Sequence, residues 1–153
     1  MADKLELKLV NKIRDGIVID HVRAGQGMRI FKWLRLDKEP GATVALVINA
    51  YSEAMGKKDI IKVAKDIPVD FKALGLIDPS ITVNVIRSHE IAEKIQLQLP
   101  DKVENVLLCK NPRCITSTEG YVAHVFHLVD AVAQTYRCEY CDDVRAAADF
   151  RGS

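Results

Sequence analysis

Several hallmarks of membrane, catalytic and nucleic-acid-binding proteins are missing from this 153-residue sequence. No apolar run approaches the roughly 18 residues that a membrane-spanning helix needs. The sequence contains no HExxH motif, no phosphate-cradling glycine loop and no Ser/His/Asp or Cys/His arrangement, so a stand-alone enzyme has no support. The net charge is only +1 and aromatic residues make up 6% of the chain, which argues against a broad nucleic-acid-binding surface.

The first residues of the sequence also lack an apolar run. The first six residues, MADKLE, include three charged side chains and no apolar segment. We therefore expect no signal peptide and a cytoplasmic location. In that reducing compartment, paired cysteines favour metal binding over disulfides.

What the sequence does contain is four cysteines in its last third, spaced as Cys109-x4-Cys114 and Cys138-x2-Cys141. Two short loops can each present two thiolates, and Zn²⁺ accepts four sulfur ligands at about 2.3 Å. The alternatives are four free thiols, or iron in a rubredoxin-like site, which the x4 spacing disfavours. Four thiolates leave no open coordination position, so the pattern predicts a structural zinc rather than a catalytic one.

The hydrophobic pattern up to about residue 100 predicts a sheet with two helices. Strands are expected at 17–21, 43–49, 60–63, 81–87 and 90–97, helices at 24–36 and 68–76, a turn at 55–59 and a short strand or arm at 5–10. This order is that of an α+β, ferredoxin-like domain with one extra strand. Because two helices cover only one face of such a sheet, the other face must meet water, a partner or a ligand.

The remaining residues predict a small all-β zinc domain. Leu99-Pro100-Asp101-Lys102 marks the expected boundary, which gives domains at 1–100 and 101–153. Strands are predicted at 105–109, 122–129 and 132–138. A domain of about 50 residues with so few large apolar side chains needs a stabilising cross-link such as a bound metal ion. Metal binding should therefore contribute to the folding free energy of this domain.

Several stretches of the sequence are characteristic of one known family. They are residues 16–21 (GIVIDH), 55–62 (MGKKDIIK), 82–86 (TVNVI), 99–100 with 105–109 (LP and NVLLC), and the cysteine pairs with the second written CEYC. In the order and spacing of these stretches, the chain resembles the regulatory chain of aspartate carbamoyltransferase (aspartate transcarbamoylase) over nearly its whole length.

The resemblance implies a non-catalytic subunit in the allosteric control of pyrimidine biosynthesis. The first domain would bind the nucleotide effectors CTP, UTP and ATP. The second would hold one structural Zn²⁺ and dock on the catalytic chain. Two regulatory chains would pair through their first domains, and six catalytic chains would assemble with six regulatory chains. Neither nucleic acid nor a membrane is an expected partner, and a zinc-ribbon nucleic-acid-binding protein is the alternative function.

The resemblance also implies site residues by position. The base and ribose would be met by Lys12, Ile13, Val18, Asp20, Asn84, Ile86, His89 and Ile91, and the triphosphate by His21, Lys62 and Lys94. Asn111 and Asp142 would contact the catalytic chain. Without the resemblance, Lys62 and Lys94 would be ordinary solvated strand lysines, and Asp20-His21 could cap a helix.

Four positions depart from the family pattern. The family commonly has a small residue at Lys12 and a tyrosine at His89, so these two positions are expected to affect nucleotide preference. Arg113 and Asp143 also differ, and they are expected to alter the details of docking.

Overall fold

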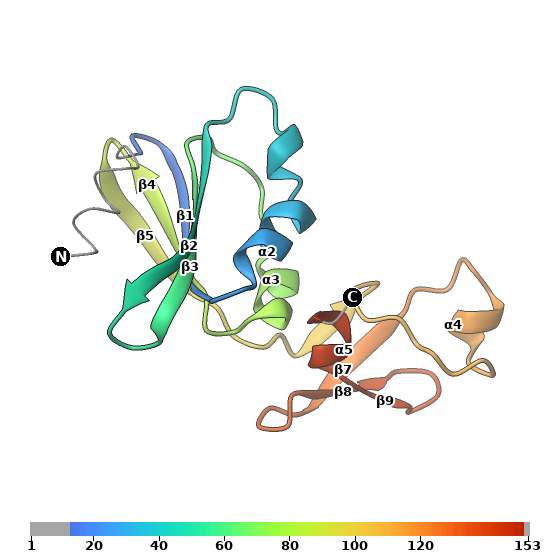
Figure 1. Ribbon diagram of the computed structural model, residues 1–153. Helices are drawn as coiled ribbons and strands as arrows, with labels where there is room; N and C mark the ends of the chain where they lie inside the picture. Colours follow the sequence, from blue (N-terminus) through green and yellow to red (C-terminus); the bar gives the residue numbers. More distant parts are fainter. Residues whose placement is uncertain (1–12, 152–153) are drawn as a thin grey trace. The chain divides into compact units, whose positions relative to one another are not determined.

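The computed structural model describes residues 13–151, so the expected arm at 5–10 and Lys12 lie outside the described residues. Contacts divide the described chain into two compact units (Figure 1). Unit 1 consists of residues 13–69 and 80–97, and unit 2 consists of residues 70–79 and 98–151. The chain therefore passes from one unit to the other at three points.

Unit 1 is built on a five-stranded antiparallel sheet. Its strands are β1 (Gly16–Arg23), β2 (Val44–Ser52), β3 (Gly56–Val63), β4 (Thr82–Arg87) and β5 (Glu90–Gln96). The strand order is β2-β3-β1-β4-β5. The first four strands follow the ferredoxin-like order, and β5 is the predicted extra strand at the edge next to β4.

One face of this sheet forms the core of unit 1. Along β1, Ile17 and Ile19 are buried while Val18 and Asp20 between them are partly exposed, as the two-residue period of a strand requires. The helix α2 (Gly27–Trp33) contacts β2 and β3, and its Ile30 is fully buried. A 3₁₀ turn, η1 (Leu36–Lys38), follows α2.

The helix predicted at 24–36 is shorter than expected. Gly25 has a φ of 96° and Arg35 a φ of 54°, both outside the helical region. These left-handed residues interrupt the helical hydrogen bonds on either side, although the apolar spacing continues through them.

β3 begins at Gly56, so the predicted turn at 55–59 is wrong except at its first residue. The turn instead occupies residues 53–55. The residues wrongly predicted as a turn include Asp59, which is 1% exposed and faces the core side of the sheet. Its carboxylate accepts hydrogen bonds from the backbone N–H groups of Gly25 (3.0 Å), Gly27 (2.9 Å) and Asn49 (3.1 Å).

Two β-bulges flank β3 near Asp59. In β1 the register shifts between Ile19 and Val22, and in β2 it shifts between Val47 and Ala50. Each bulge inserts an extra residue and so reverses which face the following side chains occupy. The reversal in β1 allows two consecutive residues, Asp20 and His21, to lie on the face opposite α2.

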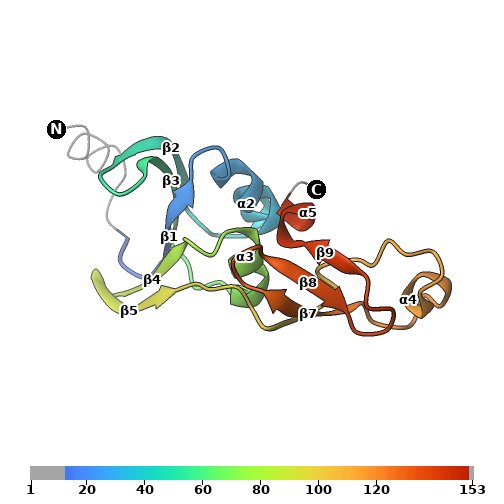
Figure 2. The ribbon, with the colours of Figure 1, turned by 90° about the horizontal axis from the view of Figure 1, so that it is seen from below.

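Unit 2 has a small antiparallel sheet, in which β7, β8 and β9 lie side by side (Figure 2). The strands are β6 (Lys102–Glu104), β7 (Val125–Asp130), β8 (Thr135–Cys138) and β9 (Val144–Ala146), in the order β6-β7-β8-β9. The strand predicted at 105–109 is wrong: Asn105 has a φ of 56° and ends β6, and residues 105–109 form a loop. Strand β9 and the helices α4 (Ile115–Thr118) and α5 (Ala147–Arg151) were not predicted.

The core of unit 2 includes a helix from the middle of the sequence. Asp70 caps α3 (Phe71–Ile77) by accepting from the N–H groups of Lys72 and Ala73. Contacts place α3 beside α5, and Leu76 is fully buried in the unit 2 core. That core also contains Val103, Leu107, Phe126, Tyr136, Ala147 and three of the four cysteines.

No helix within residues 13–151 is long and apolar enough to cross a membrane.

Candidate functional site

The four cysteines of unit 2 meet in one cluster. Their sulfur atoms all lie within 4.8 Å of one another. The Sγ atoms of Cys109 and Cys141 are 3.6 Å apart, and those of Cys114 and Cys138 are 3.8 Å apart. A disulfide would need about 2.05 Å, whereas sulfurs about 2.3 Å from a central ion at tetrahedral corners are about 3.8 Å apart. The spacing therefore fits a metal centre with four sulfur ligands.

The loops that carry these cysteines direct backbone donors at the sulfurs. The N–H of Asn111 points to Cys109, that of Thr116 to Cys114, and those of Tyr140 and Cys141 to Cys138. Hydrogen bonds of this kind favour the thiolate, which is the form that binds a metal. The backbone of the ligand loops is thus already arranged for metal binding.

The thiols in this cluster differ in acidity. Burial raises the pKa of Cys109 to about 12 and also raises the pKa of Cys138. In contrast, the hydroxyl of Thr116 donates to Cys114 and lowers the pKa of that thiol to about 7. Because a metal ion binds the thiolates, occupation of the cluster must release protons.

The two residues predicted to contact the catalytic chain lie in the ligand loops. Asn111 is half-buried, and its side-chain oxygen accepts from the N–H of Arg113 at 3.1 Å. Asp142 is exposed, has a φ of 64° and pairs with Arg137 at 2.6 Å. Exposed apolar side chains stand next to the metal ligands in sequence, namely Leu108, Ile115 and Tyr140.

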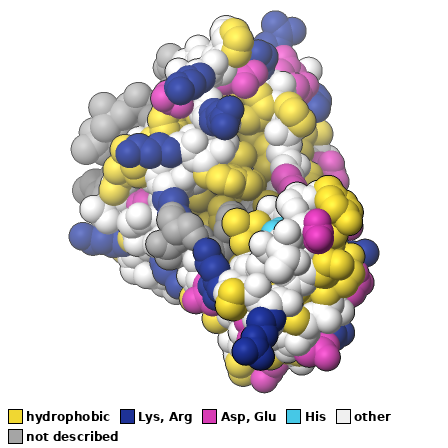
Figure 3. Space-filling model, turned by 90° about the vertical axis from the view of Figure 1, so that its right-hand side faces the viewer, with side chains coloured by type: hydrophobic (Ala, Val, Ile, Leu, Met, Phe, Trp, Pro, Cys, Tyr) yellow, Lys and Arg dark blue, Asp and Glu magenta, His cyan; other side chains and the backbone are white. Residues whose placement is uncertain are grey.

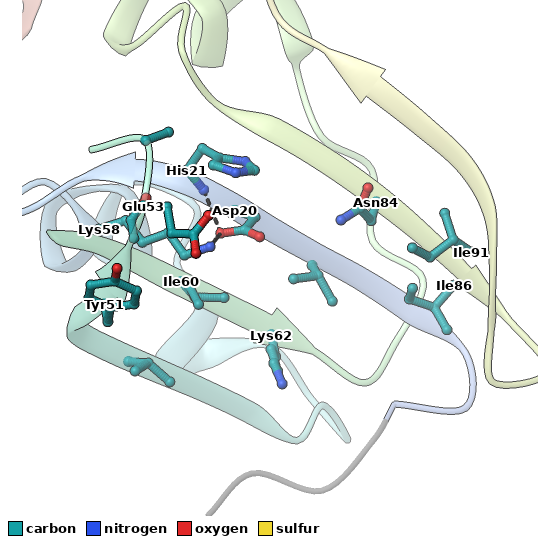
Figure 4. A pocket seen from close by; sticks show the side chains of 14 residues that line it. Asp20, His21, Tyr51, Glu53, Lys58, Ile60, Lys62, Asn84, Ile86 and Ile91 are labelled. Carbon is teal, nitrogen blue, oxygen red and sulfur yellow. Dashed lines mark hydrogen bonds and ion pairs between the residues drawn. The ribbon is translucent and has the colours of Figure 1, made fainter. Parts of the chain in front are cut away.

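Unit 1 contains a pocket of about 540 Å³ on the sheet face opposite α2 (Figure 4). Strands β1, β3 and β4 supply its floor, and the end of β2 with the following turn supplies one wall. The lining residues are Val18, Asp20, His21, Val47, Tyr51, Ser52, Glu53, Ala54, Lys58, Ile60, Lys62, Asn84, Ile86 and Ile91.

Seven of the residues expected to bind nucleotide line this pocket. They are Val18, Asp20, His21, Lys62, Asn84, Ile86 and Ile91. The strand register explains part of this, because it pairs Val18 with both Lys62 and Asn84, and pairs Asn84 with Lys94. Paired residues share a face, so these four form one row across the sheet.

Three other expected residues do not line the pocket. Lys94 lies at the end of the row just described, on the outer strand β5, and is exposed. His89 is in the tight β4–β5 turn with a φ of 68°, where its N–H donates to the carbonyl of Arg14 at 2.9 Å. Ile13 precedes β1 in irregular backbone.

The pocket has one charged end and one apolar end (Figure 4). At the charged end, Asp20 accepts from the N–H of His21 at 2.6 Å and pairs with Lys58 at 3.1 Å. At the apolar end stand Ile86 and Ile91. Two buried acceptor or donor atoms, Nδ1 of His21 and Oδ1 of Asn84, have no hydrogen-bond partner among the described residues. These two atoms are therefore available to a ligand.

Sequence reasoning missed the second lysine of the pocket. Lys58 was assigned to a turn, yet it alternates with Ile60 and Lys62 on the same face of β3. The repeat Lys-x-Ile-x-Lys was the available signal. Tyr51 and Glu53 were also missed, because the bulge in β2 changes which side chains face the pocket.

Comparison with known proteins identifies the family of the chain. A family model described as "Aspartate carbamoyltransferase regulatory chain, allosteric domain" matches residues 8–98, and one described as "Aspartate carbamoyltransferase regulatory chain, metal binding domain" matches residues 101–150. The chain belongs to the aspartate carbamoyltransferase regulatory chain family. All residues lining the pocket fall within the allosteric-domain match, and all four cysteines fall within the metal-binding match.

Relatives from several bacteria carry the same family name. The regulatory chain of Clostridium tetani is 54% identical over 136 residues, covering 88% of this chain and 94% of the relative. That of Clostridium botulinum is 52% identical over 141 residues, covering 92% and 96%. That of Bifidobacterium longum is 42% identical over 135 residues, covering 88% and 96%. As a regulatory chain of this family, the protein is a non-catalytic subunit with an allosteric and a metal-binding domain.

Proposed function

We propose that this regulatory chain senses the nucleotides CTP, UTP and ATP through the pocket of unit 1. One observation supports the proposal most directly. The pocket lies inside the region that matches the allosteric domain, and seven of the residues that the family resemblance implies as nucleotide-binding line it. The residues that the resemblance implies and the lining of the pocket share one face of the sheet.

The chemistry of the pocket suits a nucleotide. The apolar end formed by Ile86 and Ile91 can cover a base, and Oδ1 of Asn84 can accept a hydrogen bond from an exocyclic amino group. Lys62 has no ion pair among the described residues, so its ammonium group is available to a phosphate. Lys94 stands in the same row and can reach further along a polyphosphate chain.

The test is calorimetric titration of the purified, metal-loaded chain with CTP, ATP and UTP. Lys62→Ala and Lys94→Ala are each expected to weaken CTP binding, because each removes one positive charge from the row that crosses the pocket face. Lys32→Ala is the matched control, since Lys32 is an exposed lysine on α2, on the opposite side of the sheet. If either lysine variant binds CTP with wild-type affinity, that lysine does not contribute to nucleotide binding.

Failure of all three nucleotides to bind the wild-type chain would leave unit 1 without its proposed ligand. Oligonucleotide binding would then be the next test, although the surface gives it little support. Among the described residues drawn in Figure 3, Lys and Arg side chains are interspersed with Asp and Glu, and no continuous basic field is seen.

We further propose that the metal is Zn²⁺, one ion per chain, held by Cys109, Cys114, Cys138 and Cys141. Four thiolates at these separations match the tetrahedral preference of Zn²⁺ and leave no position open for catalysis. The metal would supply structure to unit 2. Metal analysis of the purified chain tests the identity and the stoichiometry of the ion.

The metal-binding domain, from about residue 101 onward, is proposed to dock on the aspartate carbamoyltransferase catalytic chain. Asn111 and Asp142 are the proposed contacts, and the exposed apolar side chains beside the ligands could be buried there. The complete assembly would contain six catalytic and six regulatory chains in the cytoplasm, with regulatory chains paired through the domain formed by about the first 100 residues. Nucleotide binding controls activity only if the nucleotide binds one state of the assembly more tightly than the other.

Replacing one metal ligand tests the docking role. Cys114→Ala is expected to abolish metal retention and, with it, association with the catalytic chain, because the ligand loops lose their common anchor. Association can be measured by size-exclusion chromatography with the purified catalytic chain. A variant that loses its metal and still assembles would contradict docking through the metal-binding domain.

A further inference from the structure

Thr116 occupies an unusual position beside the metal cluster. It lies in the short helix α4, two residues after Cys114, and is 4% exposed. Its hydroxyl Oγ1 lies 3.1 Å from Sγ of Cys114, and its backbone N–H is directed at the same sulfur. Among the described residues, this sulfur is the only hydrogen-bond partner of the hydroxyl.

A buried hydroxyl with a single partner is sensitive to the charge state of that partner. A hydroxyl donates a stronger hydrogen bond to an ionised acceptor than to a neutral one, and a cysteine sulfur that binds a metal is a thiolate, so this contact is strongest in the metal-bound cluster. The contact also fixes the direction of the sulfur, because the hydroxyl is held by a β-branched side chain in a packed environment.

The other two buried cysteines have no hydroxyl group that donates to their sulfur among the described residues. Cys109 and Cys138 receive hydrogen bonds from backbone N–H groups, and the side chains that hydrogen-bond to their sulfurs are cysteines of the same cluster. Cys114 is thus the ligand that receives both a backbone donor and a hydroxyl donor.

We propose that Thr116 is a positioning residue of the metal centre, which donates a hydrogen bond to the sulfur of Cys114 and keeps that sulfur directed at the metal. This role goes beyond the four ligands themselves, and it rests on the proposed occupation of the cluster by a metal ion. Partners of this kind, one shell outside the ligands, typically change metal affinity by roughly 10- to 100-fold when they are removed.

A set of three variants of the full-length chain tests this role. Thr116→Val removes the hydroxyl and keeps the shape, whereas Thr116→Ser keeps the hydroxyl. Thr118→Val is the matched control, because the hydroxyl of Thr118 is exposed and donates to the carbonyl of Ile115 in the same helix. Transfer of Zn²⁺ to a chromogenic chelator gives the affinity of each variant. Thr116→Val should bind roughly 10- to 100-fold more weakly than wild type, and the other two variants should match wild type.

A spectroscopic readout separates positioning from packing. With Co²⁺ bound, the sulfur-to-metal charge-transfer band reports the electron density on the thiolates. Loss of the hydroxyl donor should shift this band to lower energy in Thr116→Val and leave it unchanged in Thr116→Ser and Thr118→Val. A defect in packing alone would weaken binding without this shift.

The outcomes distinguish this role from the proposed function. Wild-type Zn²⁺ affinity and an unshifted Co²⁺ band in Thr116→Val would overturn the role of Thr116, and so would a Thr116→Ser variant that behaves like Thr116→Val. If Thr116→Val folds only at saturating metal, the Co²⁺ spectrum of that loaded form still decides. A wild-type chain that binds neither metal would instead overturn the proposed metal centre.

Discussion

At the scale of single residues, Asp59 organises unit 1. It is almost fully buried, and its carboxylate satisfies three backbone N–H groups from two different segments, at the start of α2 and at the bulge of β2. Gly27 is needed opposite it, because a Cβ atom there would lie 2.7 Å from Cβ of Asp59. On the other face of the sheet, the preceding residue, Lys58, lines the pocket. Of these two consecutive residues of β3, Asp59 therefore lies in the core of unit 1 and Lys58 lies in the candidate ligand site.

Replacing this carboxylate should destabilise unit 1. Asp59→Asn keeps the shape but turns one acceptor oxygen into an NH₂ group that faces N–H donors, so at least one buried donor loses its partner. We expect a loss of about 2–3 kcal/mol in the free energy of unfolding. Trp33, the single tryptophan of the chain, lies in α2, so its fluorescence during denaturant unfolding reports on this unit.

Asp66→Asn provides the control for this measurement. Asp66 is exposed and pairs with Arg87 at the surface, where removal of its charge should change stability by less than about 0.5 kcal/mol. Equal effects of the two substitutions would show that the buried contacts of Asp59 contribute no more than a surface ion pair.

The residues that sequence reasoning found and missed differ in a physical way. The four cysteines were predictable, because their chemistry requires a common partner and their spacing matches loops that can supply it. Asp59 and Lys58 were missed because Met-Gly-Lys-Lys-Asp is polar and contains a glycine, which is typical of a turn. Only the pairing of β3 with its neighbours on both sides overrides that local preference.

At the scale of elements, α3 shows how a glycine can be fixed by packing within a helix. A Cβ atom at Gly75 would collide with the carbonyl oxygen of Gln98 in unit 2. That oxygen belongs to the backbone, so it cannot move away as a flexible side chain could. The close approach brings α3 against the segment that leads into β6.

Gly75→Ala should therefore destabilise unit 2 even though alanine is the better helix former. We expect the collision to cost about 1–3 kcal/mol, which exceeds the gain of about 1 kcal/mol in helix propensity. Hydrogen exchange of the buried β7 and β8 amides, for example those of Phe126 and Tyr136, measures the loss. Gly120→Ala is the control, because a Cβ there would meet nothing within 4 Å. Unchanged protection in Gly75→Ala would mean that the backbone at Gln98 yields easily.

The order of the strands and helices from β1 to β5 was predictable, and several of their boundaries were not. Alternation and helical spacing gave the sequence of strands and helices, because the buried face of each element repeats with its own period. The bulges in β1 and β2 interrupt that period, and the left-handed residues Gly25 and Arg35 end α2 without a break in the apolar pattern. In unit 2 the short helices α4 and α5 and the strand β9 are too brief to show a period.

At the scale of the whole molecule, the two units should depend differently on the metal. Three of the four cysteines belong to the buried core of unit 2, whereas the core of unit 1 contains none of them. Removing the ion should therefore leave unit 2 without a central part of its core and leave unit 1 folded.

Chelation of the full-length chain tests this difference. Hydrogen exchange should rise throughout β7 and β8, while the fluorescence of Trp33 and the proposed binding of CTP should persist. Readdition of Zn²⁺ should reverse the change. Preserved protection of unit 2 without metal would show that the apolar core is sufficient by itself.

Acid should have the same effect as the chelator. The raised pKa values of Cys109 and Cys138 mean that the bare cluster holds protons on these thiols at neutral pH, so the metal must displace them. Lower pH favours the protonated thiols and therefore metal release, and higher pH favours binding. Metal content measured after equilibration across a pH series should fall steadily toward acid, and retention independent of pH would contradict proton displacement.

The chain runs through unit 1, unit 2, unit 1 and then unit 2 again, and this order affects how such a protein can change over evolutionary time. A recombination break near residue 100 would separate the cysteines from α3, which contributes Leu76 to the core around them. A protein that received only the part after the break would have the metal ligands without the apolar side chains of α3. A protein that kept only the part before the break would have α3 without the core residues that it packs against. Selection should therefore keep the parts before and after residue 100 together in one gene, even though the pocket lies in the first part and the cysteine cluster in the second.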